Sequence, residues 1–144
     1  MANIIPDAFK LELLSGTHNF ASGGNTFKIA LYVTTLGPPY TTSSTAYSTT
    51  NEVSSSGTGY TTGGNTLDGQ AVSVPGSNTA IVDFTNEVFS TVTLTSLGAA
   101  IYNYTNSNKL CLVIDFGGNK VATAGDFTIV FPAATAGAAI IRVA

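Results

Sequence analysis

Hydrophobic and other residues alternate most regularly in residues 27–34. Phe27, Ile29, Leu31 and Val33 occupy every second position there, and Lys28 is among the residues between them. A period of two residues is typical of a strand that buries one face and exposes the other. We therefore predict a half-buried β-strand in this segment.

Residues 7–15 carry the signals of a short helix. Asp7 can cap the N-terminus, Phe9 and Leu13 lie four positions apart, and Gly16 can end the helix. Residues 9–13 also alternate in the manner of a strand. Because the cap and the stop signal agree, we predict a helix over residues 7–15.

Short apolar segments follow one another from residue 66 to the end of the chain. Turn residues separate them at 75–78, 105–108 and 117–119 and from Pro132 onwards. The predicted strands are residues 66–74, 79–84, 88–94, 97–104, 109–116, 126–131 and 138–143. About eight short strands with turns every 8–12 residues indicate an all-β fold, a single-domain antiparallel β-sandwich or jelly-roll-like fold over residues 1–144. We expect its core to contain Phe27, Ile29, Leu31, Leu112, Ile114, Phe127 and Ile129.

Residues 35–65 form a long excursion rich in Gly, Thr and Ser. Loops of this length inside compact domains are usually functional or interaction elements. The excursion is too polar to form a core, yet its exposure would leave four large side chains bare, namely Tyr40, Tyr47, Val53 and Tyr60. Contact with a neighbouring subunit resolves this conflict, so these four are the interface candidates. We expect residues 38–64 to be mobile in the isolated protein and ordered in an assembly.

Charged residues are scarce in this chain. They form 9% of the sequence, whereas about 25% is typical of globular domains. Since the centres of interfaces are depleted in Lys, Glu and Asp, this composition permits a partner to cover much of the surface. The net charge of −3 and the dispersed Lys and Arg residues argue against direct nucleic-acid binding.

The sequence predicts neither secretion nor membrane insertion. Its first residues lack the basic region and the long apolar stretch of a signal peptide. No apolar run approaches the roughly 18 residues of a membrane span. The single Cys111 excludes an intrachain disulfide and fits synthesis in a reducing cytoplasm.

Residues with reactive side chains are few. His18 is the only histidine, and no nucleophile elbow or triad spacing accompanies it. We interpret it as a structural residue that ties the loop after the helix to the backbone. Cys111 lies between Leu110 and Leu112, where a free thiol behaves as a small buried hydrophobe. The prediction is a protein that is not an enzyme and has no catalytic residues.

Acidic residues provide two further candidate sites. Asp115, Asn119 and Asp126 could supply oxygen ligands to calcium, but their spacing matches no known loop signature. Asp83 and Glu87 lie four positions apart across a predicted turn, where we interpret them as solvated turn acids rather than a catalytic pair. We therefore predict that the protein binds no metal and no cofactor.

Three stretches of the sequence carry a family resemblance. They are TFKIALY at 26–32, AYSTTNEV at 46–53 running into GTGYTTGG at 57–64, and LVIDFG at 112–117 with AGDFTI at 124–129. Together they resemble small β-rich structural proteins of tailed bacteriophages. The resemblance implies a non-enzymatic virion structural protein, above all a capsid decoration or cement protein that binds and stabilises the major capsid protein lattice. It further implies a homo-oligomer on the capsid surface, made in the host cytoplasm, with the major capsid protein or other virion proteins as partners.

A second interpretation is a tail, neck or head-fibre component with a receptor- or glycan-binding role. Tyr40, Tyr47 and Tyr60 on one long loop could supply a surface for such ligands. The absence of Trp and of a repetitive shaft argues against a complete fibre. A small hydrolase is the third and weakest interpretation, because no set of acid, base and nucleophile can be assembled.

Overall fold

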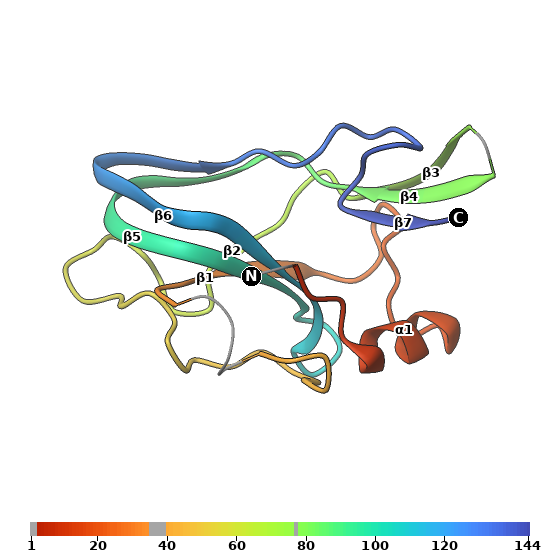
Figure 1. Ribbon diagram of the computed structural model, residues 1–144, viewed down its shortest axis with the longest axis horizontal. Helices are drawn as coiled ribbons and strands as arrows, with labels where there is room; N and C mark the ends of the chain where they lie inside the picture. The colour runs from red at the N-terminus through yellow and green to blue at the C-terminus, as the bar shows by residue number, and fades with distance from the viewer. Residues whose placement is uncertain (1–2, 35–39, 77) are drawn as a thin grey trace.

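The computed structural model describes residues 3–34, 40–76 and 78–144, which form one helix and two antiparallel sheets (Figure 1). The elements are α1 (Asp7–Leu14), β1 (Phe27–Tyr32), β2 (Asn65–Thr66), β3 (Ala71–Gly76), β4 (Thr79–Asp83), β5 (Glu87–Asn103), β6 (Lys109–Ile129) and β7 (Ile141–Val143). Sheet A has the strand order β2-β1-β5-β6, and sheet B has the order β3-β4-β7. The all-β prediction is confirmed, with seven described strands in place of about eight.

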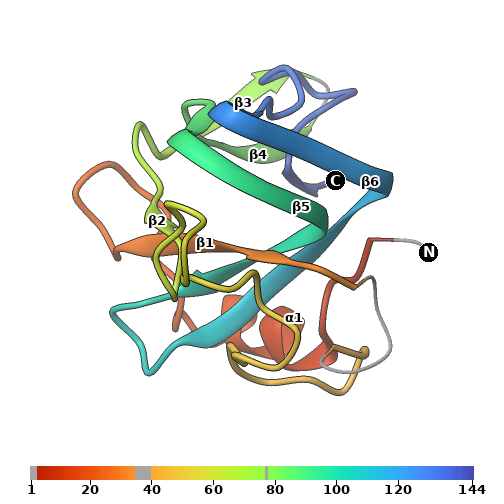
Figure 2. The ribbon, with the colours of Figure 1, turned by 90° about the vertical axis from the view of Figure 1, so that its left-hand side faces the viewer.

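The long hairpin of β5 and β6 folds back on itself and contributes to both layers of the sandwich. Figures 1 and 2 show the two strands turning together at one end of the molecule. The rings of Phe116 and Phe127 consequently lie 6.0 Å apart, although a straight strand would separate these positions by roughly 36 Å. Sheet B extends the second layer and adds Val82 and Ile141 to the same core.

Several predicted strand boundaries are wrong. The segments 88–94 and 97–104 are one strand, β5, and 109–116 and 126–131 both belong to β6. The turn predicted at 117–119 is a distortion inside β6, where Gly117 has a φ of 75°. Glycine permits this conformation in a β-bulge as readily as in a turn. The predicted strand 66–74 is divided between β2 and β3, and 138–143 is shortened to β7.

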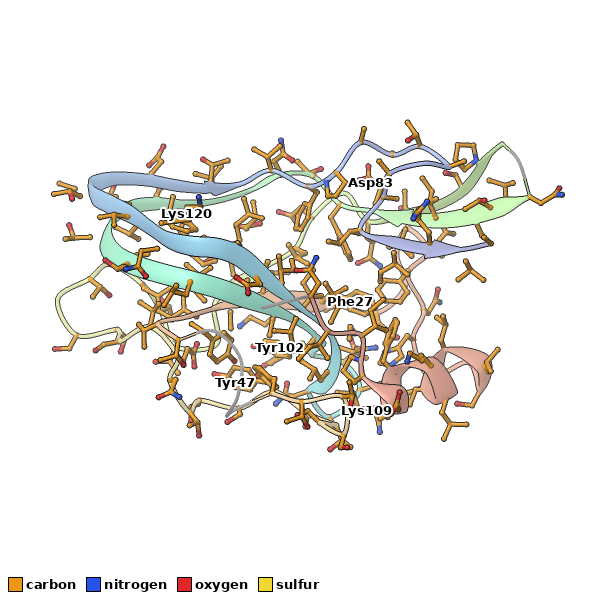
Figure 3. All side chains as sticks on the ribbon, viewed as in Figure 1. Phe27, Tyr47, Asp83, Tyr102, Lys109 and Lys120 are labelled. Carbon is orange, nitrogen blue, oxygen red and sulfur yellow. The ribbon has the colours of Figure 1, made fainter. Side chains whose placement is uncertain are left out.

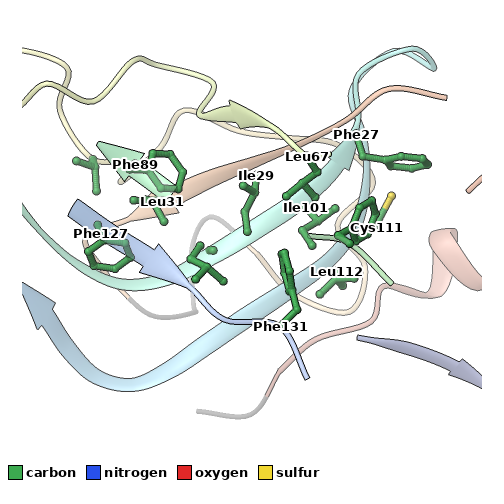
Figure 4. Close-up of a cluster of buried hydrophobic side chains, with 14 of the residues drawn as sticks. Phe27, Ile29, Leu31, Leu67, Phe89, Ile101, Cys111, Leu112, Phe127 and Phe131 are labelled. Atoms are coloured by element: carbon green, nitrogen blue, oxygen red, sulfur yellow. The ribbon is translucent and has the colours of Figure 1, made fainter. Parts of the chain in front are cut away.

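The larger hydrophobic core lies between the two layers (Figure 4). Its buried members predicted from the sequence are Phe27, Ile29, Leu31, Leu112, Phe127 and Ile129. Ile114 packs against this core but is only partly buried. Cys111 is fully buried in it, as its apolar neighbours predicted. The core prediction is therefore confirmed.

A second, smaller core covers the opposite face of sheet A. Ala30 and Tyr32 of β1 pack there against Tyr40 from the excursion and Leu110 from β6. β1 is consequently buried on both faces, so the prediction of a half-buried strand is wrong. The described part of the excursion, residues 40–65, covers this face of the sheet rather than projecting from it.

Most interface candidates are buried inside their own chain. Tyr40, Val53 and Tyr60 expose 2%, 4% and 3% of their surfaces, and Tyr47 is half-buried. The premise that these side chains would be bare without a neighbour is therefore wrong. The accessible surface of 6938 Å² matches the roughly 6,900 Å² expected for a folded monomer of this mass. Residues 35–39 of the predicted excursion lie outside the described residues.

Helix α1 forms where the sequence predicted, with a different N-cap. Pro6 is the cap residue, and Asp7 lies in the first turn, where its negative charge suits the helix dipole. Gly16 ends the helix with a φ of 75°, while the amides of Gly16 and Thr17 donate to the carbonyls of Leu13 and Glu12. The stop prediction is confirmed and the Asp7 cap is wrong. In the described part of the chain, no helix is long and apolar enough to cross a membrane.

Candidate functional site

Reactive side chains gather where α1 meets the turn between β5 and β6. The carboxylate of Glu12 bonds His18 Nε2 at 2.9 Å and Lys109 Nζ at 2.6 Å. On the other side of the imidazole, Asn103 Nδ2 lies 3.0 Å and Cys111 Sγ 3.9 Å from Nδ1. Figure 3 shows Lys109 beside α1. We call these five residues the His18 cluster.

Asn103 determines the tautomer of His18. Its Oδ1 accepts the Asn106 amide at 3.1 Å, and its Nδ2 also donates to Asn25 Oδ1 at 3.0 Å. These partners orient the Asn103 amide so that Nδ2 donates to His18 Nδ1. In the neutral imidazole the hydrogen is then on Nε2, and this N–H group donates a hydrogen bond to the Glu12 carboxylate. The structural role predicted for His18 therefore holds, but its partners are side chains rather than the backbone.

Cys111 is placed as a structural thiol. None of its surface is exposed, and burial, together with the Glu12 carboxylate, raises its pKa. A nucleophilic cysteine requires a thiolate, which a cationic and accessible environment stabilises. In addition, the lone pair of His18 Nδ1 already accepts from Asn103. The cluster contains the residue types of a catalytic Cys–His site. Its hydrogen bonds instead form a structural network that connects α1 to β5 and β6.

Acid should weaken the His18 cluster through Glu12. Burial would raise the pKa of Glu12, but hydrogen bonds from Lys109 and His18 outweigh it and lower that pKa. Because the folded pKa lies below the unfolded one, the contribution of Glu12 is complete above the ordinary glutamate pKa and is lost as pH falls through the lowered value.

Glu12→Gln should lower the free energy of unfolding by about 1 kcal/mol at neutral pH and reduce its decline between about pH 5 and pH 3. Urea unfolding at a series of pH values measures both effects. Asp68→Asn changes an exposed acid between β2 and β3, so its effect should stay below about 0.5 kcal/mol. If the stability of Glu12→Gln falls with pH in parallel with that of the native protein, Glu12 is not the group through which acid weakens the His18 cluster.

Glu52 organises the excursion around one carboxylate. It accepts the hydroxyls of Tyr47 and Tyr60, each at 2.6 Å, and the Gly63 amide at 2.7 Å. The Tyr60 hydroxyl in turn accepts the Leu31 amide of β1 at 3.1 Å. Burial, and then the neighbouring Glu52, raise the pKa of Tyr60, which keeps its hydroxyl a donor. This network connects three parts of the excursion to sheet A.

Tyr32, Tyr40 and Ser48 close a second ring of hydrogen bonds. The Ser48 amide donates to Tyr40 Oη at 2.8 Å, and the two tyrosine hydroxyls lie 2.7 Å apart. Tyr32 Oη donates to the Ser48 carbonyl at 2.7 Å. Each buried hydroxyl is thereby satisfied, so Tyr40 is a structural residue of the second core.

The tyrosine surface considered for glycan binding is not formed by the described excursion. Tyr40 and Tyr60 are buried. Tyr47 stacks on Tyr102, with ring centroids 4.5 Å apart and an interplanar angle of 23°. The aromatic rings thus pack against the protein itself.

The candidate carboxylates have separate structural roles. Asp115 Oδ1 accepts the Gly117 amide at 2.7 Å, and Asp126 Oδ1 accepts the Thr91 amide at 3.2 Å. Within the described residues, no group of three or more His, Cys, Asp or Glu could hold a metal ion. Glu87 is buried and accepts Asn65 Nδ2 at 2.7 Å, so its prediction as a solvated turn acid is wrong. Asp83, at the end of β4, is partly exposed.

An open groove of about 450 Å³ runs along β6 into the core. Ile114 and Phe116 line it from the first layer, and Phe127 and Phe131 line it from the second. Lys120, labelled in Figure 3, is the only charged residue of the described lining. The edge of the sandwich core is therefore accessible between the two layers.

A second groove, of about 430 Å³, lies between α1 and sheet B. Leu13 and Leu14 line it from the helix side, Val72 and Val143 line it from the sheet, and no Asp, Glu, Lys or Arg belongs to the described lining. Large hydrophobic side chains on the flanking elements are exposed. We define the α1–β3 apolar surface as Leu11, Leu14, Val72, Val74 and Val143, with exposed fractions of 69%, 89%, 53%, 68% and 52%.

No protein-family model matches this chain, and neither does any curated protein or solved structure. The networks and surfaces of the chain itself are therefore the basis for assigning its function.

Proposed function

We propose that this chain is a non-enzymatic structural protein of a virus particle, and specifically a capsid decoration protein of a tailed bacteriophage. The α1–β3 apolar surface is the observation that carries the proposal. Its five side chains are exposed, and Leu14, Val72 and Val143 among them line a groove whose described lining has no Asp, Glu, Lys or Arg. Exposed apolar patches of this kind mark sites of protein association.

The internal networks support a role based on contacts rather than on a reaction. His18 and Cys111 are buried, and both imidazole nitrogens of His18 already form hydrogen bonds, Nδ1 with Asn103 and Nε2 with Glu12. Glu52 is likewise committed to the excursion. These side chains hold the sandwich together, which leaves the apolar surfaces as the features directed outward.

Decoration fits the physics of such a surface. Apolar burial contributes about 25 cal/mol per Å² before the costs of association are subtracted. Many copies on a regular lattice make modest individual contacts sufficient through multivalency. The resemblance to phage structural proteins of residues 26–32, of 46–53 with 57–64, and of 112–117 with 124–129 is our reason for choosing a lattice of the major capsid protein as the partner.

Quantitative mass spectrometry of purified particles of the encoding phage tests this proposal. We expect hundreds of copies of the native chain per particle. The Leu14→Lys variant should no longer bind to particles, because Leu14 is 89% exposed in the proposed contact surface and a lysine there would place a charge in it. Val121→Lys, at an exposed valine of β6 outside the α1–β3 apolar surface, should remain attached. A few copies per particle would place the protein in the tail, neck or fibre instead, and absence from particles would overturn a virion role.

A further inference from the structure

We propose that β3 is a self-pairing edge strand, through which two copies of this chain join their B sheets into one continuous antiparallel sheet. The inference concerns one edge of the α1–β3 apolar surface. It goes beyond the proposed function, because it applies to the isolated protein and requires no particle.

β3 lies at the open edge of sheet B. In the strand order β3-β4-β7, only β4 pairs with β3 among the described strands. Residues 71–75 of β3 are all exposed, and Val72 and Val74 expose 53% and 68% of their surfaces. An edge of this kind offers unpaired backbone donors and acceptors beside apolar side chains, which is the template for adding another strand.

The lack of charge around β3 favours an identical partner. Edge strands of monomeric proteins are commonly protected by charged residues, especially Lys. Residues 69–82 contain no Asp, Glu, Lys or Arg, and neither does the described lining of the adjacent groove. A second copy would therefore meet this edge without any contact between like charges. Pro75 and the register irregularity between Ser73 and Gly76 limit the pairing to residues 72–74.

A twofold axis at Ser73 makes such pairing self-complementary. Ser73 then lies opposite its own equivalent, while Val72 of each copy lies opposite Val74 of the other. Cross-strand pairs of β-branched residues stabilise antiparallel sheets. β7 lies on the other side of β4 from this edge, so the contact is confined to β3 and leaves Val143 of β7 and Leu14 of α1 outside it. A twofold contact is closed, and association stops at the dimer.

Size-exclusion chromatography with light scattering tests the pairing. We expect a dimer for the native chain and for Val121→Lys, and a monomer for Val74→Lys. The two valines are matched strand positions with 66% and 68% exposure, on β6 and β3 respectively. A native chain that is monomeric at its highest soluble concentration would overturn the inference. Equal dissociation by both substitutions would also overturn it.

Disulfide trapping provides a second test that does not depend on the lysine variants. Cys111 has no exposed surface, so under native conditions an introduced cysteine is the accessible thiol. Ser73→Cys should form an intermolecular disulfide rapidly with an added oxidant, because a twofold axis brings the two sulfurs together. Thr123→Cys, at an exposed position of β6, should not. Equal trapping of both variants would overturn the inference.

Discussion

Tyr60→Ser should lower the free energy of unfolding by about 3–5 kcal/mol, which is the range for removal of a large buried aromatic ring. The ring exposes 3% of its surface and packs 5.7 Å from Phe89, measured between ring centroids. Its hydroxyl joins Glu52 of the excursion to the Leu31 amide of β1. The substitution therefore removes core contacts and a connection between the excursion and sheet A together.

Tyr104→Ser is the matched control for this prediction. Tyr104 is 57% exposed, and Lys28 Nζ lies 5.1 Å from its ring centroid. An exposed cation–π contact contributes about 0.5–1 kcal/mol, so the loss should not exceed about 1 kcal/mol. Urea unfolding of the two variants gives the comparison. Equally small effects would show that the excursion is not part of the cooperative core.

The burial of Tyr60 also changes the expected behaviour of the free protein. From the sequence, residues 38–64 were predicted to be mobile until a neighbour covered them. In the structure, the Val53 amide donates to the Leu31 carbonyl at 2.9 Å, and Val53 is buried. Hydrogen exchange on the free protein should therefore find this amide protected.

The strand pattern could be predicted well where it depends only on residues that are close together in the sequence. Phe27, Ile29 and Leu31 alternate in the sequence, and all three face the larger core. The merging of strands into β6 could not be predicted in the same way. Gly117 supplies the same conformational freedom to a reversing turn and to a bulge. The choice between them depends on pairing with β5, many residues away in the sequence.

The role of the excursion was missed because its partners lie on the other face of sheet A. Ala30 and Tyr32 occupy the positions of β1 that the alternation assigned to solvent, and their side chains are seldom used for a fully solvated face. Ala30 and Ala100 of β5 leave room for Tyr40 on this face, and the Tyr40 ring packs edge-on against Tyr32 with ring centroids 5.3 Å apart. This deviation from a polar pattern was the available signal that β1 is buried on both faces.

For the candidate site, the sequence predicted residue character better than partners. His18 and Cys111 were expected to be structural, and both are buried. The connection of His18 to Glu12 and Asn103 was not predictable, since Asn103 is 85 residues away in the sequence. The α1–β3 apolar surface was missed for a similar reason. Leu14 and Val72 are ordinary apolar residues until the fold leaves both exposed beside the same groove.

Glu52→Ala should lower the free energy of unfolding by about 3–5 kcal/mol, because it leaves several donors without their charged acceptor. The hydroxyls of Tyr47 and Tyr60 and the amide of Gly63 all donate to this carboxylate. Urea unfolding at neutral pH measures the loss. Asp68→Ala, which removes an exposed acid between β2 and β3, should change stability by less than about 0.5 kcal/mol.

Glu52→Gln separates the charge of Glu52 from its shape. Tyr47 and Tyr60 donate to different oxygens of Glu52. Glutamine fills the same space but replaces one of these oxygens with an NH₂ group, which donates and cannot accept from the tyrosine at that position. We expect a loss of about 1.5–3 kcal/mol, smaller than that of Glu52→Ala, because hydrogen bonds to a charged group are the stronger ones. Native stability in both Glu52 variants would show that packing alone holds the excursion. Loss only in Glu52→Ala would show that shape matters and charge does not. The expected order, with alanine below glutamine and glutamine below the native chain, identifies the carboxylate as the group that fastens residues 47–63 to the sandwich.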